Sequence, residues 1–427
     1  MIQRRIKPKE EPFLEPLLHT GKTYVVLAAA LTVIVILFLY AWYTQLTQGL
    51  GVTGMRTPVG AAWGVYISNF VFFACMAHGG MAISAGVRLL KLRQFAVVAR
   101  MGEVLTLVAI MMAGLSIMID LGRPDRSFNI VLYWPERVVS SPLVWDMTVI
   151  VLYFTLSASY LWLTIRRDLH HYVGRFQKRG LLYKVLLRGY RPDQEPAIER
   201  VAWWLSVAVL VLIVMLSGGV IPWIFGLQGG RPGWYGSLAG PQFLTAALGT
   251  SLGAVLVIAA LLRKVYKWQA HIKPEVFKGL GAGLAVLTHL YIYMTIAEIM
   301  TMRFAGPHAE FTISETLLEG NFALVFWPMV VLGMALPAVF LIAQTLRSRW
   351  FSLPGTVVAA SVILIAFWVK RFIIVVPSLA RPLLPFPTGT YYPSWIEWAV
   401  IVGIFAMAAL LYITYLKIFP IVETEEQ

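Results

Sequence analysis

The chain has 427 residues, of which 59% are hydrophobic and only 13% are charged, and its formal net charge is +14. A typical soluble domain carries about 25% charged residues, so the composition excludes an ordinary soluble protein. The single cysteine, Cys75, excludes an internal disulfide, a four-cysteine iron–sulfur cluster and a tetrahedral thiolate zinc site in this chain. A redox metal centre must therefore belong to another subunit, or be a haem held by histidines.

Long apolar runs, each about as long as the hydrocarbon core of a bilayer is thick, follow one another along the chain. They predict an all-α integral membrane protein. The first run ends in Trp42 and Tyr43 without a small-residue cleavage site, so we interpret it as a span and not as a signal peptide. We predict ten transmembrane helices, at about residues 22–45, 61–90, 95–119, 142–165, 198–222, 240–263, 278–303, 320–346, 354–377 and 394–418.

Basic residues are distributed unevenly between the two sides of this arrangement. Most of the 35 Lys and Arg residues fall in the N-terminal tail and in the loops on its side, above all in residues 166–200. Because loops rich in Lys and Arg stay in the cytoplasm, we predict that both termini are cytoplasmic. The net charge then needs no nucleic acid to explain it, and contact with anionic lipid headgroups is a by-product.

His78 lies near the middle of the predicted second span, in the apolar stretch "FFACMAHGGMAIS" (72–84). A polar side chain at that depth must face the protein interior and find a partner. Small neighbours such as Gly79 and Gly80 allow another helix, or a flat ligand, to approach closely. Three interpretations stay open: a histidine bonded to a neighbouring helix, a site on a quinone or proton path, and a haem ligand shared with His289.

Other polar residues mark the ends of the first spans. Asn69 lies about 180° around the helix from His78. Glu103 is near the cytoplasmic start of the third span, and Asp120 ends it on the outer side. The outer loop that follows, 120–146, contains Arg123 and Asp146 among many charged, aromatic and proline residues. We interpret it as a docking surface and the mouth of a cavity, with a salt-bridged external cap as the alternative.

Two later spans carry charges at membrane depth. The seventh has His289, Tyr293 and Glu298, and the ninth has Lys370 and Arg371. We expect Lys370 to reach outward to the interface. Arg371 stays charged and needs an anion, and at 1.5 Å per residue its depth agrees with that of Glu298. We therefore predict that Glu298 pairs with Arg371 and that Asp146 is the competing partner.

Several short motifs occur in one order along the chain: "DLGRP" (120–124), "SPLVWD" (141–146), "PGW" (232–234), "RFIIVVPSL" (371–379), "YYPSW" (391–395) and "KIFPIVETEE" (417–426). With them the chain resembles the NrfD/polysulfide reductase membrane-subunit family. Its ten-span form is most similar to the quinol-oxidising membrane subunits of alternative complex III. Where the family is expected to have an acidic residue before the Arg-Phe of the ninth span, this chain has Lys370.

The resemblance implies a fold of two four-helix bundles, spans 2–5 and 6–9, with spans 1 and 10 beside them. It divides the chain into residues 1–60 (tail and first span), 61–222 (first bundle, on the quinone side), 223–377 (second bundle) and 378–427 (last span and tail). It also implies a bacterial cytoplasmic membrane, and menaquinone or another quinone as the substrate, with no haem or metal in this chain.

The resemblance further implies a ferredoxin-like iron–sulfur subunit on the outer face and a molybdopterin-type or related subunit beyond it. Some complexes of the family add multihaem cytochromes c and a second NrfD-like subunit. His78 and Asp120 match the histidine and aspartate of the family's quinone sites.

We therefore expect a membrane subunit of a respiratory or photosynthetic oxidoreductase that exchanges electrons between quinone and the iron–sulfur subunit, with proton translocation as a further expectation. His78 and Asp120 are the predicted catalytic residues. The predicted quinone-binding residues are His78, Asp120, Arg123, Asp146 and Asn69, and the predicted proton path is Glu103, His289, Tyr293, Glu298 and Arg371. The alternatives are a secondary transporter and a membrane anchor whose haem b is ligated by His78 and His289.

Overall fold

The computed structural model describes residues 12–18, 20–55, 61–172, 180–304, 306–381, 389 and 391–423. These residues form helices and connecting turns, and no strand. Ten helical segments among them are long and apolar enough to cross a membrane, which confirms the all-α fold and the ten predicted spans. The basic N-terminal residues and residues 424–426 of the C-terminal motif lie outside the described residues.

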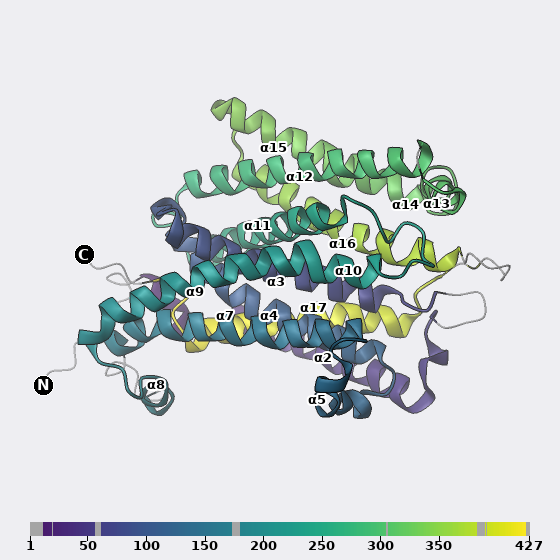
Figure 1. The fold of residues 1–427 in the computed structure, drawn as a ribbon. Coiled ribbons are helices and arrows are strands. Elements are labelled where there is room, and N and C mark those ends of the chain that lie inside the picture. The colour runs from purple at the N-terminus through teal and green to yellow at the C-terminus, as the bar shows by residue number, and fades with distance from the viewer. Residues whose placement is uncertain are drawn as a thin grey trace, which may run out of the picture.

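The spans run side by side, with both chain ends at one end of the array (Figure 1). In order they are α2 (Lys22–Gln48), α3 (Val65–Leu89), α4 (Ala96–Asp120), α7 (Pro142–Tyr172), α9 (Glu195–Met215) continued by η7 (Leu216–Val220) and α10 (Ile221–Gly226), α11 (Ala239–Val265), α12 (Pro274–Phe304), α14 (Ala323–Pro328) continued by η8 (Met329–Ala335) and α15 (Leu336–Leu346), α16 (Leu353–Ala380) and α17 (Trp395–Ile418).

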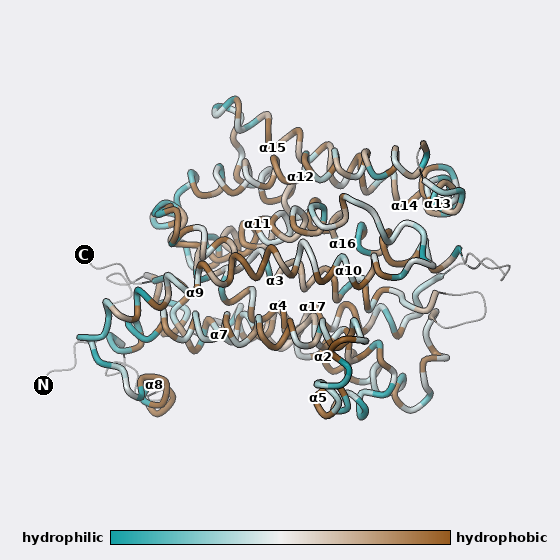
Figure 2. Tube along the Cα trace, viewed as in Figure 1, coloured by the Kyte–Doolittle hydropathy of each residue, from teal (hydrophilic) through white to brown (hydrophobic). Residues whose placement is uncertain are grey.

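Short helices cover the two ends of the array. We call the end near the termini the terminal end. It carries α1 (Glu15–Leu18), η3 (Arg93–Phe95), α8 (Gly180–Leu186), η6 (Pro192–Gln194) and η9 (Ser348–Trp350). We call the opposite end the far end. It carries η2 (Leu50–Val52), η4 (Pro124–Ser127), α5 (Phe128–Leu132), α6 (Trp134–Arg137) and α13 (His308–Leu318). Hydrophilic residues gather toward the ends, and hydrophobic residues fill the length between them (Figure 2).

Two spans change from α- to π-helical hydrogen bonding partway along. The π segments η7 and η8 each end two residues before a proline, Pro222 and Pro337. Proline has no backbone N–H, so it cannot donate to the carbonyl four residues earlier, and the helix widens locally. Hydropathy predicts a span at both places but does not indicate the π-helical turns. In η7 the widening decides where Ser217 points.

Close backbone contact joins α3 to α4. A Cβ atom added to Gly80 would lie 2.7 Å from the carbonyl oxygen of Gly102, which is too close for any side chain. The contact depends on glycine at both positions. Around this pair, α3 and α4 pack with α7 and α9, and we call these four the first helix group. The second helix group is α11, α12, α15 and α16.

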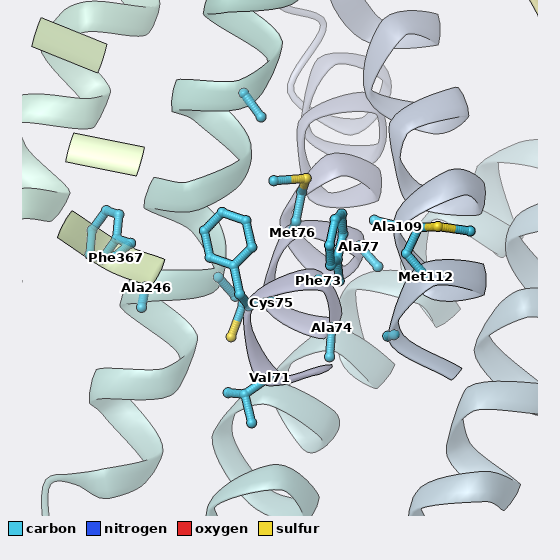
Figure 3. Close-up of a cluster of buried hydrophobic side chains, with 14 of the residues drawn as sticks. Val71, Phe73, Ala74, Cys75, Met76, Ala77, Ala109, Met112, Ala246 and Phe367 are labelled. Carbon is cyan, nitrogen blue, oxygen red and sulfur yellow. The ribbon is translucent and has the colours of Figure 1, made fainter. Parts of the chain in front are cut away.

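The two groups share one hydrophobic core. α3 packs against α11 and α16 as well as against α9, and α2 packs against α17 beside the first group. Figure 3 shows this core between Cys75 on α3 and the helices that carry Ala246 and Phe367. Because α3 packs against helices of both groups, the division into two bundles and the four predicted residue ranges remain an interpretation.

Candidate functional site

His78 is buried, with 3% of its surface exposed, and has partners on two other helices. Its Nδ1 lies 2.7 Å from the hydroxyl of Ser217, which η7 carries into the interior. The edge of its ring meets the ring of Tyr153 on α7, with centroids 4.9 Å apart. No described residue forms a hydrogen bond with its Nε2. One ring nitrogen is thus held by Ser217, and the other can exchange a proton with a bound molecule.

Tyr153 belongs to a polar stripe that runs the length of α7. At 100° per residue the members of this stripe lie within about 40° of one direction, while Val151 and Leu152 face outward. All but Thr164 are buried. The stripe residues are Asp146, Tyr153, Ser157, Tyr160, Thr164 and Asp168. Hydroxyl and carboxyl groups therefore line the interior of the first helix group from the far end to the terminal end.

A hydrogen-bonded chain leads from the terminal end to Glu103. At the surface, Arg88 pairs with Glu199 at 2.5 Å. Arg88 Nε donates to the Tyr160 hydroxyl at 2.8 Å, and Ser84 Oγ lies 3.3 Å from the same hydroxyl. Ser84 in turn donates to Glu103 at 2.5 Å. Because Glu103 is only 1% exposed, this chain connects a buried carboxyl group to the surface.

A buried ion pair lies beside this chain. Arg100 on α4 pairs with Asp168 on α7, and both side chains are 1% exposed. A second carboxylate, Glu423 from the segment after α17, lies 3.5 Å from Arg100 and 3.7 Å from Arg88. The arginine and carboxylate charges therefore compensate one another, which offsets the cost of removing them from water.

Asp120 lies far from His78. Hydrogen bonds between α3 and α4 set their antiparallel register: Asn69 to Ser116 at one end and Ser84 to Glu103 at the other. This register places Asp120 beside Val65, the first residue of α3, whereas His78 lies thirteen residues further along. At 1.5 Å per residue the two side chains are separated by about 20 Å along the helices. They do not form one cluster.

Asp120 instead belongs to a polar cluster at the far end. Tyr66 is close enough to both Asp120 and Glu397 to interact with them electrostatically. Its hydroxyl donates to Gln45 on α2 at 2.7 Å, and Gln45 donates to the carbonyl of Ile119 at 2.9 Å. Asp120 is 4% exposed. This far-end cluster ties α2, α3, α4 and α17 together.

The sequence analysis missed Glu397, which is fully buried at the start of α17. It accepts hydrogen bonds from the backbone N–H groups of Gly54, at 2.7 Å, and Ser394, at 2.8 Å, and from the Tyr391 hydroxyl. Ser394 and Glu397 form a capping box. The spacing Ser-x-x-Glu before an apolar run is a recognised sign of a helix start, so the sequence contained a signal for this residue.

Of the other predicted quinone-binding residues, Asn69 is buried between three helices. It donates to Ser116 and accepts from the indole of Trp368 on α16, each at 3.1 Å. Asp146 is 4% exposed and has no ion pair within the described residues. Arg123 faces solvent, 65% exposed, and pairs with Asp125, holding the pKa of that carboxyl below its usual value. The structure thus brings neither Asn69 nor Arg123 to His78.

The predicted pair of Glu298 with Arg371 is wrong. Glu298 pairs with Lys370 at 3.3 Å and also accepts a hydrogen bond from Gln242 on α11 at 3.1 Å. Adjacent residues on a helix point about 100° apart, and it is Lys370 that faces α12. Lys370 is 4% exposed, so the expectation that it reaches outward is also wrong. Lys370 and Glu298 line a small far-end cavity with Ser378, of about 20 Å3, enough for one water.

Arg371 is 1% exposed and points toward α11. Its guanidinium lies over the ring of Phe243, with 4.8 Å between the guanidinium carbon and the ring centroid. None of its three nitrogens forms a hydrogen bond within the described residues, and the same is true of the hydroxyl of Tyr291. Asp146 is not the partner of Arg371 either, because no ion pair joins these two residues within the described parts of the chain.

His289 and Tyr293 face away from the interior. His289 is half-buried and its Nδ1 contacts the carbonyl of Ala285 on its own helix, at 2.8 Å. Tyr293, one turn later, is 67% exposed. Since His78 bonds to Ser217 in the first helix group, the arrangement disfavours a haem shared by His78 and His289. It also places Tyr293 outside any interior proton path.

Ten candidate spans, with titratable side chains buried among them, define a polytopic membrane protein. Residues 51–383 match the family described as polysulphide reductase, NrfD. The chain is 30% identical over 407 residues to a putative membrane subunit of dimethyl sulfoxide reductase from Halobacterium salinarum, covering 92% of this chain and 90% of that protein. It therefore belongs to the NrfD family.

Two more distant relatives also align over nearly their whole length. An Hdr-like menaquinol oxidoreductase integral membrane subunit of Archaeoglobus fulgidus is 22% identical, with 93% of this chain and 94% of that protein covered. A menaquinone reductase integral membrane subunit of Nitratidesulfovibrio vulgaris is 24% identical, with 90% and 88% covered. The alignments cover 93% and 90% of this chain, so the similarity is not confined to one segment of it.

Proposed function

We propose that the chain is the quinone-interacting membrane subunit of a multi-subunit oxidoreductase. The observation that carries the proposal is His78: a histidine buried near mid-membrane, fixed through Nδ1 by Ser217 and perpendicular to the ring of Tyr153, with no hydrogen bond to Nε2 from any described residue. Two of the relatives described above are named for menaquinol or menaquinone chemistry. The names of these two relatives and the position of His78 both support a membrane quinone as the substrate.

The chemistry needs groups of this kind. Converting a quinol to a quinone releases two electrons and two protons, and histidine exchanges protons near neutral pH. In the proposed mechanism, His78 Nε2 accepts one proton from a quinol oxygen, passes it to the polar stripe of α7 and then accepts the second, or returns the two protons in the reverse order. Ser217 keeps the ring in place, and Tyr153 packs against the imidazole. The two electrons pass to a partner subunit.

Protons must also travel between His78 and water. We assign this role to Glu103 and to the polar stripe of α7. Glu103 is connected through Ser84 to the hydroxyl of Tyr160 near the terminal end, and Arg88, which stays protonated, holds that hydroxyl in place. From Ser84 to His78 is six residues along α3, about 9 Å, and Ser157 and Tyr153 of the stripe span that interval. Proton translocation across the membrane is part of this proposal.

The far end is the proposed docking side. We place the terminal end in the cytoplasm, as the Lys and Arg distribution predicts, and the iron–sulfur subunit at the loop 121–141. Exposed apolar side chains gather there, among them Phe128, Val131 and Val139, at 74%, 74% and 83% exposed. Asp120 and the far-end cluster lie beneath this loop. A molybdopterin-type subunit, in some complexes with cytochromes c, would bind beyond the iron–sulfur subunit. Quinol oxidation is the proposed direction.

The test is turnover of the intact complex with a short-chain quinol. His78→Gln keeps a side chain that bonds to Ser217 but cannot exchange a proton, and turnover should fall by about two orders of magnitude, the usual effect of losing a general base. Assembly of the complex should be unchanged. Control variants at His289, which faces outward, should keep their turnover. Normal turnover in His78→Gln would remove His78 from the mechanism.

A further inference from the structure

After its last span the chain folds back over the terminal end of the first helix group. Pro420 follows α17 and prevents its continuation. Phe419 stacks on Tyr183, and Ile421 and Val422 are 1% and 8% exposed. Pro420, Ile421 and Val422 are buried one after another, and this burial fixes the segment against the bundle. We call residues 419–423 the C-terminal strap.

The strap ends at a carboxylate that faces two arginines. Glu423 lies 3.5 Å from Arg100 and 3.7 Å from Arg88, and Arg100 also donates to the carbonyl of Val422 at 3.4 Å. Glu423 is partly exposed, at 27%. It lines a terminal-end cavity together with Arg88 and Glu199. The strap thus brings a negative charge from the end of the sequence to the surface end of the Glu103 chain.

Each arginine lies one helical turn from a member of the Glu103–Ser84 hydrogen bond. Arg100 precedes Glu103 by three residues on α4, and Arg88 follows Ser84 by four on α3. Even so, Glu103 bonds to the hydroxyl of Ser84 and to neither arginine. Arg100 is held by Asp168 and Glu423, and Arg88 by Glu199, Tyr160 and Glu423.

We propose that Glu423 is a positioning residue, which keeps Arg88 and Arg100 away from Glu103. A carboxylate paired with arginine stays ionised, and such a group cannot take up and release protons near neutral pH. A carboxyl group that accepts only a hydroxyl bond retains that ability. The inference rests on the proposed function, in which Glu103 relays protons to and from His78.

Charged and titratable groups from every helix packed around Glu103 face it or its two arginines, and any pH dependence reflects all of them. They are Arg88 on α3, Arg100 on α4, Tyr160 and Asp168 on α7, Glu199 on α9, Tyr415 on α17 and Glu423 in the strap. Glu423 is the carboxylate among them that lies close to both arginines.

The experiment compares Glu423→Gln with the unmodified complex in liposomes, with short-chain quinol turnover measured from acid to alkaline pH. At neutral pH the variant should oxidise quinol about tenfold more slowly. This corresponds to a shift of the curve of turnover rate against pH by about one pH unit. Turnover should recover on acidification, because a Glu103 paired with arginine takes up a proton only in more acidic solution. Glu423→Asp should restore part of the rate.

Glu275→Gln is the matched control, because Glu275 is an exposed carboxylate at the same end of the second helix group. It should leave the profile unchanged. An unchanged profile in Glu423→Gln would overturn the inference. A rate lowered equally at every pH would also overturn it, since that is the signature of structural damage alone.

Glu103→Gln separates this inference from the proposed function. If Glu423 acts through Glu103, adding Glu423→Gln to Glu103→Gln should change nothing further. Independent effects that multiply would overturn the role of the strap while leaving the proton relay in place. Unchanged turnover in Glu103→Gln alone would overturn the relay itself, and the strap inference with it.

Discussion

At the scale of single residues, the first helix group concentrates its polar side chains on the interior faces of α3, α4 and α7. His78, Glu103 and Asp146 are each at most 4% exposed. Burial of such groups in a membrane protein costs several kcal/mol unless they have partners or a function. Ser217 and Ser84 supply partners for the first two. Asp146 has no ion pair in the described chain, which makes it the next residue to test for proton transfer.

Ser217→Ala tests how His78 is held. Loss of the 2.7 Å hydrogen bond frees the ring to turn, so turnover should fall about tenfold while the complex still assembles, because one such bond contributes only about 1 kcal/mol to stability. The measurements are quinol turnover and thermal unfolding of the same preparation. Ser206→Ala is the matched control, since Ser206 lies on α9 and bonds only to its own helix, at the carbonyl of Ala202. A full rate in Ser217→Ala would show that the bond does not orient His78.

The pair of Glu298 with Lys370 makes a second residue-level prediction. Glu298→Gln strands a buried lysine and should destabilise the protein by about 3 kcal/mol. A double variant with Lys370→Gln should recover part of that loss, and Glu298→Gln with Arg371→Gln should not. Thermal unfolding of the three variants measures the coupling. If stability recovered in the double variant with Arg371→Gln and not in the one with Lys370→Gln, the pair of Glu298 with Lys370 would be contradicted.

At the scale of elements, the span limits followed from hydropathy, but the rotation of each helix about its axis did not. Lys370 and Arg371 are neighbours in sequence, and which of them faces α12 depends on how α16 packs between α11, α12 and α15. The partner of His78 depends on a π segment, because an ordinary α-helix before Pro222 would turn Ser217 to another direction. The strap contacts join residues more than two hundred positions apart, which no local pattern reports.

The contact between α3 and α4 makes an element-level prediction. In Gly80→Val the new side chain meets the carbonyl of Gly102, so the helices must separate and the register that places Ser84 beside Glu103 is lost. Overpacking of this kind costs about 1–3 kcal/mol or more. The temperature of thermal unfolding and the rate of quinol turnover should both fall. Gly86→Ala on the same helix meets no atom within 4 Å and should be neutral. Equal effects of the two changes would contradict close packing at Gly80.

At the scale of the whole molecule, the ten spans leave the first and last described residues at one end of the array (Figure 1). The proposed orientation puts that end in the cytoplasm. Single cysteines at Asn321, on the far end but outside the proposed docking loop, and at Leu181 on the terminal end are well suited to labelling, because both side chains are exposed. In a background of Cys75→Ala, an impermeant reagent added to intact cells should label position 321 and not position 181. The opposite labelling pattern would place the far end, with the proposed docking loop, in the cytoplasm.

The central claim is that a quinone binds beside His78 within the first helix group. Photo-crosslinking of the intact complex with an azido-quinone, followed by peptide mapping, tests it most directly. The account predicts label on the α3 and α7 peptides around His78 and Tyr153, competed by unlabelled quinol and strongly reduced in His78→Leu. Label on α12 or α16 around Glu298 and Arg371, unaffected by His78→Leu, would contradict it.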